Sequence, residues 1–349
     1  MTGKMPAEGK TADKPRRRFS SVWVWARLAA VIAILWWVLE RNGREKIVWT
    51  LLSADPRWAI LAVVFCFLSI VLGAYQWHLL LRIQGVEFGF MACFRSYYSG
   101  MFLNNFLPGT VGGDALRIYD VHKREGSFGK AAASTLLDRL MGFSALSFFS
   151  LLALAFEFRQ RALPAGLLLH LMQAVIAVSA AFVAMLLLLL SRRLSGALRV
   201  IIRSLGMEKL GNLHAKLEEA LTAYKARWGR IGYVFLIACV VQLLRISVSA
   251  FSAWALHLSI APVFFFAFIP LIALTAILPL NVGGWGVPQG LGTYLYALPG
   301  VLMVTGPGFD PGAAAAALAF LPTVIGMVAM LGGGFYFVFR PTHKPWKSP

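Results

Sequence analysis

Long apolar runs limit the fold of this chain more than any other feature of its sequence. Each run holds about twenty residues with few or no charges, and a helix of that length crosses the roughly 30 Å hydrocarbon layer of a bilayer. Only 14% of the residues are charged, whereas a soluble domain carries about a quarter. We therefore predict an all-α, polytopic integral membrane protein with about six to eight spanning helices. The runs lie at 21–39, 58–81, 131–156, 167–190, 231–256, 262–278 and 312–339.

Basic residues give these runs a direction across the membrane. If the N-terminus is inside, most of the 33 Lys and Arg residues fall in segments on the inner side, as the positive-inside rule requires. This distribution accounts for the formal net charge of +18. No zinc-finger or RNA-recognition motif accompanies the charge, so we exclude nucleic acid as a partner. We expect a multi-pass protein with both termini in the cytoplasm.

A less apolar linker divides the membrane domain into two halves. Within the linker, leucines and aromatic residues recur every three or four positions from Leu213 to Trp228, which predicts an amphipathic helix. This helix lies either on the cytoplasmic leaflet or packed against the protein, and the sequence favours neither. The predicted divisions are a disordered basic tail at 1–20, one membrane domain at 21–340 with halves at about 21–190 and 231–340, the linker at 192–230 and a C-terminal tail at 341–349.

The motif Leu-Pro-x-x-Val-Gly-Gly occurs twice, at 107–113 and at 278–284. Proline lacks a backbone donor and glycine permits unusual dihedral angles, so both motifs interrupt a helix. Backbone that leaves a helix inside a membrane must be buried in protein or line a wet cavity. We therefore predict two re-entrant hairpins, at about 91–113 and 279–300, that enter from opposite faces as an inverted repeat. The predicted gating residues are Pro108, Gly109, Gly112, Gly113, Pro279, Gly283 and Gly284.

Polar side chains in the first hairpin are candidates for binding an anion. Asp114 can cap a helix that begins at Ala115, and a helix start suits a phosphate. Arg117 follows within one turn and can hold a phosphate or a carboxylate with two hydrogen bonds. Asn104 and Asn105 lie on the descending arm, where unpaired amides are costly. The alternative is structural: the motif only ends a helix, and Asp114 and Arg117 form a local ion pair.

Charged residues also lie deep within two predicted spans. Asp138 and Arg139 are adjacent, and Arg245 lies near the middle of its span. An ionisable group at such depth costs at least about 2.5–3.5 kcal/mol on insertion scales and usually marks a function. We expect Asp138 and Arg245 to pair across the two halves, either in contact with substrate or as a purely structural pair. The second hairpin carries no charge, and Asn281 and Gln289 are its candidate substrate-binding residues.

No catalytic motif stands out in the sequence. The six histidines are scattered without metal-ligand spacing, and Cys66, Cys93 and Cys239 lie singly in apolar runs. The chain contains no Gly-x-Ser-x-Gly motif, no P-loop and no Asp-x-Asp pair. We therefore expect neither a metal site, nor a cofactor, nor an enzymatic activity.

Three segments resemble the signature regions of a known family. The strings NNFLPGTVGGDALRIY, ASTLLDRLMG and LPLNVGGWGVPQG are similar, in this order, to those of the flippase-like transmembrane domain of lysylphosphatidylglycerol synthases and its stand-alone relatives. The resemblance implies functional positions at Asn105, Asp114, Arg117, Asp138, Arg139, Gly283, Gly284 and Gln289. Asp138 stands where the family often has Glu, and Gln289 stands where it often has an acid, so a proton or cation role at Gln289 lacks its acid. The chain ends soon after its last span, so we expect the cytosolic aminoacyl-transferase domain of the full-length synthases to be missing.

By this resemblance, we expect the protein to flip or scramble a phospholipid or lipid-linked head group across the bacterial inner membrane. The expected substrate has an anionic head group, and Arg117, Arg139 or Arg245 would hold its phosphate while the hairpins alternate as gates. Two alternatives stay open: an integral-membrane glycosyl- or head-group transferase that acts on a lipid, and an accessory scaffold in lipid or hopanoid biosynthesis. The expected partners are membrane lipids, with a lipid-synthesis enzyme or a second copy of the chain as further candidates.

Overall fold

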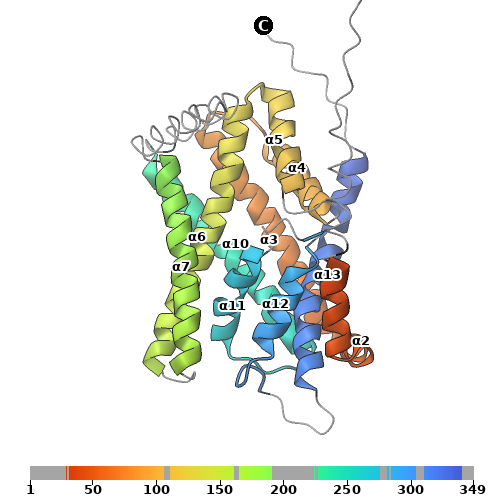
Figure 1. Cartoon of the computed structure of the whole chain (residues 1–349). Helices are drawn as coiled ribbons and strands as arrows, with labels where there is room; N and C mark the ends of the chain where they lie inside the picture. Colours follow the sequence, from red (N-terminus) through yellow and green to blue (C-terminus); the bar gives the residue numbers. More distant parts are fainter. Residues whose placement is uncertain are drawn as a thin grey trace, which may run out of the picture.

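The computed structural model shows a protein built from helices (Figure 1). It describes residues 29, 31–105, 111–160, 165–190, 224, 227–275, 281–282, 284–303 and 310–339. Within these residues, β-structure is limited to the isolated bridges Ile260–Leu302 and Val282–Trp285, which confirms the all-α fold. The helices are a segment over 31–41, α2 (Arg44–Leu52), α3 (Pro56–Ile83), α4 (Phe90–Asn104), α5 (Val111–Glu125), α6 (Phe128–Gln160), α7 (Ala165–Leu190), α10 (Trp228–Ala255), α11 (Pro262–Thr275), α12 (Val287–Tyr296) and α13 (Pro311–Val338).

Four helices in the described part of the chain are long and apolar enough to cross a membrane. These segments are Pro56–Ile83, Phe128–Phe156, Gly229–Ala255 and Pro311–Val338. α3 packs along α10, and α13 packs against α3, α4 and α12. Ile60, Leu236 and Leu331 on these helices are 63–64% exposed, as expected where the surroundings are lipid rather than water. The protein is therefore a membrane-embedded, multi-pass helix bundle, as its apolar runs predict.

Two pairs of short helices lie at opposite ends of the bundle (Figure 1). α4 and α5 occupy the end where α3 finishes and α6 begins, whereas α11 and α12 occupy the end where α10 finishes and α13 begins. The run 262–278 forms the 14-residue α11, about 21 Å long at 1.5 Å per residue, which is too short to span a bilayer. α5 continues to Glu125, so the first hairpin is longer than predicted. The depth of both hairpins in the membrane stays a prediction.

The described end of the linker packs on the bundle. Tyr224 is 4% exposed, donates to the carbonyl of Leu80 at 3.1 Å and shares a hydrogen bond of 2.8 Å with Ser134. The loss of water around its hydroxyl raises the pKa of Tyr224 to about 12. This end of the predicted amphipathic helix therefore contacts the protein. Residues 191–223 lie outside the described part of the chain, and the choice between leaflet and protein stays open there.

Glycines let the first hairpin close tightly. A Cβ built on Gly100 of α4 would lie 2.8 Å from the carbonyl oxygen of Gly113 in α5, and a Cβ on Gly113 would meet the backbone of Gly100. Side-chain carbons do not approach backbone atoms so closely, so the two helices cross with backbone against backbone. Small residues allow this approach between helices in a membrane.

We expect Gly113→Ala to destabilise the protein by about 1–3 kcal/mol, because the added methyl group overpacks the crossing of α4 and α5. Gly229→Ala is the matched control, since a Cβ at that position meets nothing within 4 Å. Thermal unfolding of the purified protein in detergent should show a lower midpoint for Gly113→Ala alone. Equal midpoints for the two variants would contradict the close crossing.

The opposite placement of the hairpins predicts labelling from opposite sides of the membrane. Lys130 at the start of α6 is exposed, and Met303 after α12 is 61% exposed. In a background that carries Cys239→Ala, a membrane-impermeant maleimide outside right-side-out vesicles should label Met303→Cys at once. It should label Lys130→Cys only after the membrane is permeabilised. Labelling of both positions from one side would refute this topology.

Candidate functional site

Four charged side chains meet between α5 and α6 in one largely buried group, the charge cluster: Asp114, Arg117, Asp138 and Arg139. The Arg117 guanidinium donates to Asp138 at 2.9 Å and to Asp114 at 3.3 Å. Arg139 donates to the two carboxylate oxygens of Asp114 at 3.0 and 3.1 Å. Positive and negative charges therefore alternate through the cluster, which is neutral as a whole.

The positions of these residues on their helices explain why they meet. Asp114 and Arg117 are three positions apart and share one face of α5. Only two residues separate the end of α5 from the start of α6, which folds back against it. Adjacent positions on a helix point about 100° apart, which lets Arg139 reach Asp114 while Asp138 faces Arg117. The structure thus brings the first two signature segments together.

Two further helices complete the surroundings of Arg117. From α3, the amide of Gln76 donates to the Asp138 carboxylate at 2.9 Å. The rings of Trp77 from α3 and Tyr97 from α4 lie against the guanidinium, with centroids 4.4 and 4.3 Å from its central carbon. The side chains of Arg117 and Asp138 are only 4% and 7% exposed. Ion pairing and cation–π contacts therefore replace the water that both groups have lost.

Two buried donors at the charge cluster lack an acceptor. Among the described residues, neither Nε of Arg117 nor Nε1 of Trp77 has a hydrogen-bond partner. A buried donor without a partner costs about 1–3 kcal/mol. Because the Trp77 indole and the Arg117 guanidinium are in contact, both unpaired donors belong to one small region of the charge cluster.

The arginines of the charge cluster suit an anionic partner. The cluster's carboxylates are bound by arginine, and among the described residues no three His, Cys, Asp or Glu side chains gather where they could hold a metal. A guanidinium binds a phosphate as well as it binds a carboxylate, in both cases through paired hydrogen bonds. An anionic group can therefore replace a carboxylate as the partner of Arg117 or Arg139.

The predicted pair between Asp138 and Arg245 is wrong. Asp138 is bound by Arg117 and Gln76, whereas in the described part of the chain no carboxylate lies within 4 Å of Arg245. The reason is helix packing: α5 folds back on α6 and places Arg117, not Arg245, against Asp138. Arg245 lies partly buried on α10, and its contact with substrate stays a prediction.

Asp114 does not cap a helix that begins at Ala115. α5 begins at Val111, so Gly112 and Gly113 are helical and Asp114 lies in the first turn. Glycine adopts helical dihedral angles as readily as unusual ones, and the sequence could not decide between them. The Asp114 carboxylate is consequently available to the arginines of the charge cluster.

The two predicted asparagines hold the first hairpin in place. The side-chain carbonyl of Asn104 accepts the N–H of Gly113 at 2.7 Å, which satisfies a donor at the start of α5. Asn105 donates to the sulfur of Met330 on α13 at 3.6 Å. Both amides therefore bind the protein itself in this conformation, and their contact with substrate stays a prediction.

Two buried amides hold the break between α11 and α12. Asn281 accepts the N–H of Val287 at 3.0 Å and donates to a carbonyl at the end of α11. Gln289 accepts the N–H of Gly286 at 2.8 Å and donates to Thr323 of α13 at 2.9 Å. Each amide residue is 1% exposed. They replace backbone hydrogen bonds that the interrupted helix loses, and their substrate binding stays a prediction.

The second turn requires glycine at two positions. Gly284 has φ +78° and Gly286 has φ +124°, in a region that other residues rarely adopt. The predicted gating residues Gly112 and Gly113 lie within α5 instead. The remaining gating residues lie outside the described part of the chain: Pro108, Gly109, Pro279 and Gly283. Gating by this whole set stays a prediction.

Sequence reasoning missed three residues of the site: Gln76, Trp77 and Tyr97. A signal for Gln76 was present, because an amide inside the apolar run 58–81 must find a hydrogen-bond partner when buried. Trp77 and Tyr97 carried no such signal, since aromatic residues are common in membrane helices and usually serve packing.

Comparison with known proteins gives a family match that covers most of the chain. The sequence model of the family described as "Lysylphosphatidylglycerol synthase TM region" matches residues 24–332. This range includes the charge cluster and both hairpins. A UPF0104 membrane protein of Methanothermobacter thermautotrophicus is 25% identical over 293 residues, which are 78% of this chain and 83% of that protein.

Two other relatives match over shorter segments. A UPF0104 membrane protein of Pyrococcus horikoshii is 29% identical over 126 residues, which are 35% of this chain and 36% of that protein. One of Methanocaldococcus jannaschii is 27% identical over 121 residues, which are 34% of this chain and 36% of that protein. The chain therefore spans about a third of the length of these two relatives.

We expect Arg117→Leu to destabilise the protein by about 3–5 kcal/mol, because it leaves the Asp138 carboxylate buried without its cation. The double variant Arg117→Leu/Asp138→Leu should recover most of this loss, since Asp114 and Arg139 remain as a balanced pair. Thermal unfolding in detergent measures both effects. A double variant no more stable than the single one would show that the two side chains are not coupled.

Proposed function

Because the chain belongs to the family of lysylphosphatidylglycerol synthase transmembrane regions, which ties it to membrane lipids, we propose that it moves a phospholipid or lipid-linked head group between the two leaflets of its membrane. The observation that carries the proposal is the charge cluster, in which the buried Arg117 binds two carboxylates and keeps one N–H without a partner among the described residues. We place the protein in a bacterial inner membrane, with its basic end toward the cytoplasm.

A buried charge cluster is unusual in a membrane bundle that serves only as a scaffold. Each ionisable group at depth costs at least about 2.5–3.5 kcal/mol on insertion scales, and replacing a buried ion pair by apolar residues is often neutral or stabilising. Packing α5 against α6 through two acids and two arginines therefore costs more free energy than packing them through apolar side chains. The presence of these charged residues supports a function that needs charge within the bundle.

The unpaired donors support an anionic substrate. A phosphate oxygen beside the guanidinium of Arg117 and the indole of Trp77 would accept the two hydrogen bonds that lack an acceptor among the described residues. Asp114 and Asp138 already hold Arg117, so a phosphate arriving there exchanges with a carboxylate instead of meeting a bare charge. Such an exchange limits the binding energy and allows the head group to leave again.

The two hairpins support alternating access to the charge cluster. They lie at opposite ends of the bundle (Figure 1), and in each hairpin side-chain amides accept backbone N–H groups: Asn104 in the first, Asn281 and Gln289 in the second. Displacing one hairpin would open the polar interior toward one side, while the other hairpin stays closed. Broken helices that meet between two halves are a recurrent transporter design.

Reconstitution into vesicles tests the proposal. Vesicles that contain the protein and a fluorescent phosphatidylglycerol should lose the fluorescence of both leaflets to external dithionite, whereas protein-free vesicles should lose about half. Arg117→Leu/Asp138→Leu should fall to the protein-free level, because it removes the phosphate-binding charge while it keeps the fold. Gly229→Ala is the matched control and should equal the wild type.

Two outcomes would count against translocation. Wild-type vesicles that behave as protein-free ones with labelled phosphatidylglycerol, phosphatidylethanolamine and phosphatidylcholine would overturn it. Formation of a new lipid when a sugar nucleotide is supplied would favour a head-group transferase instead.

A further inference from the structure

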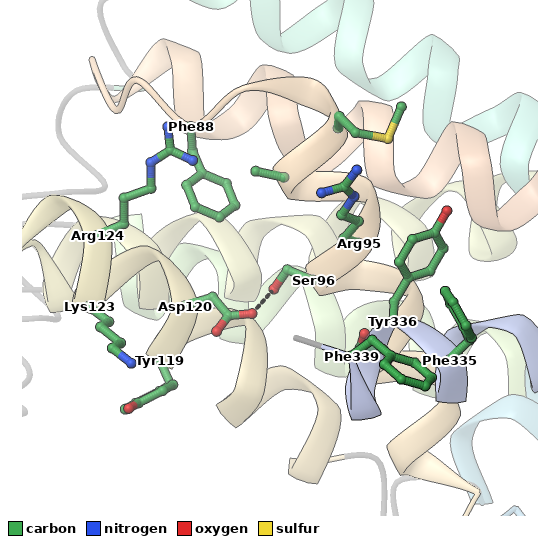
Figure 2. Close-up of a pocket in the computed structure, with 13 residues that line it drawn as sticks. Phe88, Arg95, Ser96, Tyr119, Asp120, Lys123, Arg124, Phe335, Tyr336 and Phe339 are labelled. Atoms are coloured by element: carbon green, nitrogen blue, oxygen red, sulfur yellow. Dashed lines mark hydrogen bonds between the residues drawn. The ribbon is translucent and has the colours of Figure 1, made fainter. Parts of the chain in front are cut away.

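A cavity of about 470 Å³ lies at the end of the bundle where α4 begins and α5 ends. The last turn of α13 and the residue after it form its third side. Figure 2 shows Lys123 and Arg124 of α5 on one side and the aromatic residues of α13 on the other, with Arg95 of α4 between them. The cavity is distinct from the charge cluster, none of whose four residues lines it.

Positive charge dominates this cavity. Among the described residues, Arg95, Lys123 and Arg124 line it, together with one carboxylate, that of Asp120. In the described part of the chain, no carboxylate lies within 4 Å of Arg95 or Lys123, and Arg124 approaches only its neighbour Glu125, at 3.6 Å. Lining charges of one sign attract and concentrate an ion of the other sign. The cavity therefore favours an anionic group.

Two of these cations make cation–π contacts with aromatic rings. The guanidinium of Arg95 lies 5.7 Å from the ring centroid of Tyr336, and that of Arg124 lies 5.5 Å from the ring of Phe88. These cation–π contacts hold the guanidinium planes without using their N–H groups, so the N–H groups can still bind oxygen atoms. A phosphate suits such donors because it accepts several charge-assisted hydrogen bonds.

The remaining wall of the cavity is apolar and exposed. Phe335 and Phe339 at the end of α13 are 63% and 69% exposed, and Met91 at the start of α4 is 53% exposed. A free phosphate ion would use the cations but gain nothing from this wall. A lipid would use both, with its head group at the cations and its acyl chains along the rings. The geometry therefore favours a lipid over a soluble anion.

We propose that this cavity binds the phosphate-bearing head group of a membrane lipid, with Arg95 and Lys123 as its main cations and Phe335 and Phe339 along its chains. The lipid comes from the leaflet at the basic end of the bundle.

The cavity and the charge cluster share the first hairpin. Ser96 donates to Asp120 across α4 and α5 at 2.7 Å; Ser96 precedes Tyr97, and Asp120 lies one turn beyond Arg117. The cavity residue Asp120 is therefore about one helical turn along α5 from Arg117 of the cluster. The use of the cavity as a loading position rests on the translocation proposed above, whereas the binding itself does not.

Native mass spectrometry of the purified full chain tests the binding. The protein in detergent is offered phosphatidylglycerol and phosphatidylcholine of identical acyl chains in equal amounts, and the bound lipids are counted. We expect phosphatidylglycerol to be preferred, and Arg95→Gln/Lys123→Gln to weaken its binding about tenfold. Arg82→Gln/Arg230→Gln is the matched control, because it removes two exposed cations outside the cavity. Phe335→Ala/Phe339→Ala should also weaken binding.

The outcomes separate the two proposals. Equal loss of binding in the cavity variant and the control variant would overturn the cavity site, as would displacement of the lipid by inorganic phosphate at the same concentration. Selective binding that depends on Arg95 and Lys123 supports the site even if vesicles show no translocation, in which case translocation alone fails. If translocation proceeds unchanged in Arg95→Gln/Lys123→Gln while binding is lost, the loading role is overturned.

Discussion

The guanidinium of Arg117 is shared between two carboxylates, and the packing of four helices depends on this arrangement. Asp114 comes from its own helix α5 and Asp138 from α6, while Trp77 of α3 and Tyr97 of α4 cover the faces of the guanidinium. A charge inside an apolar bundle must be paired, since neither lipid nor apolar side chains can replace its hydration. The ion pairs therefore favour the packing in which these faces of α3 to α6 turn inward, and among the described residues one N–H of Arg117 has no acceptor there.

The two copies of the repeated motif share a sequence but do not share a local structure. In the first copy the helix starts already at Val111, whereas in the second copy it starts only at Val287, after two glycines with positive φ. The residues that follow explain the difference. Asp114 and its neighbours continue a helix readily, whereas Pro288 is suited to the first turn of a new one. The first hairpin consequently carries the charges, and the second carries neutral amides that close its break.

The first hairpin links the charge cluster to the basic cavity. Backbone contact between Gly100 and Gly113 holds its arms together, and the bond from Ser96 to Asp120 crosses it near the cavity. A shift of α4 against α5 would therefore change both the cavity and the surroundings of Arg117. In the translocation proposed above, such a coupled change would link the cavity to the charge cluster.

Apolar runs of about twenty residues identified the membrane-spanning helices, and the Leu-Pro-x-x-Val-Gly-Gly motif indicated that the helical structure is interrupted near each copy, because length and backbone freedom are local properties of a sequence. Only the tertiary structure decided which charged residues pair and which helices form the cavity. Asp138 pairs with Arg117 rather than with Arg245 because α5 packs against α6, and the aromatic residues of α13 complete a cavity with cations from α4 and α5. Such contacts join segments far apart in the chain, and no local sequence pattern predicts which helices pack side by side.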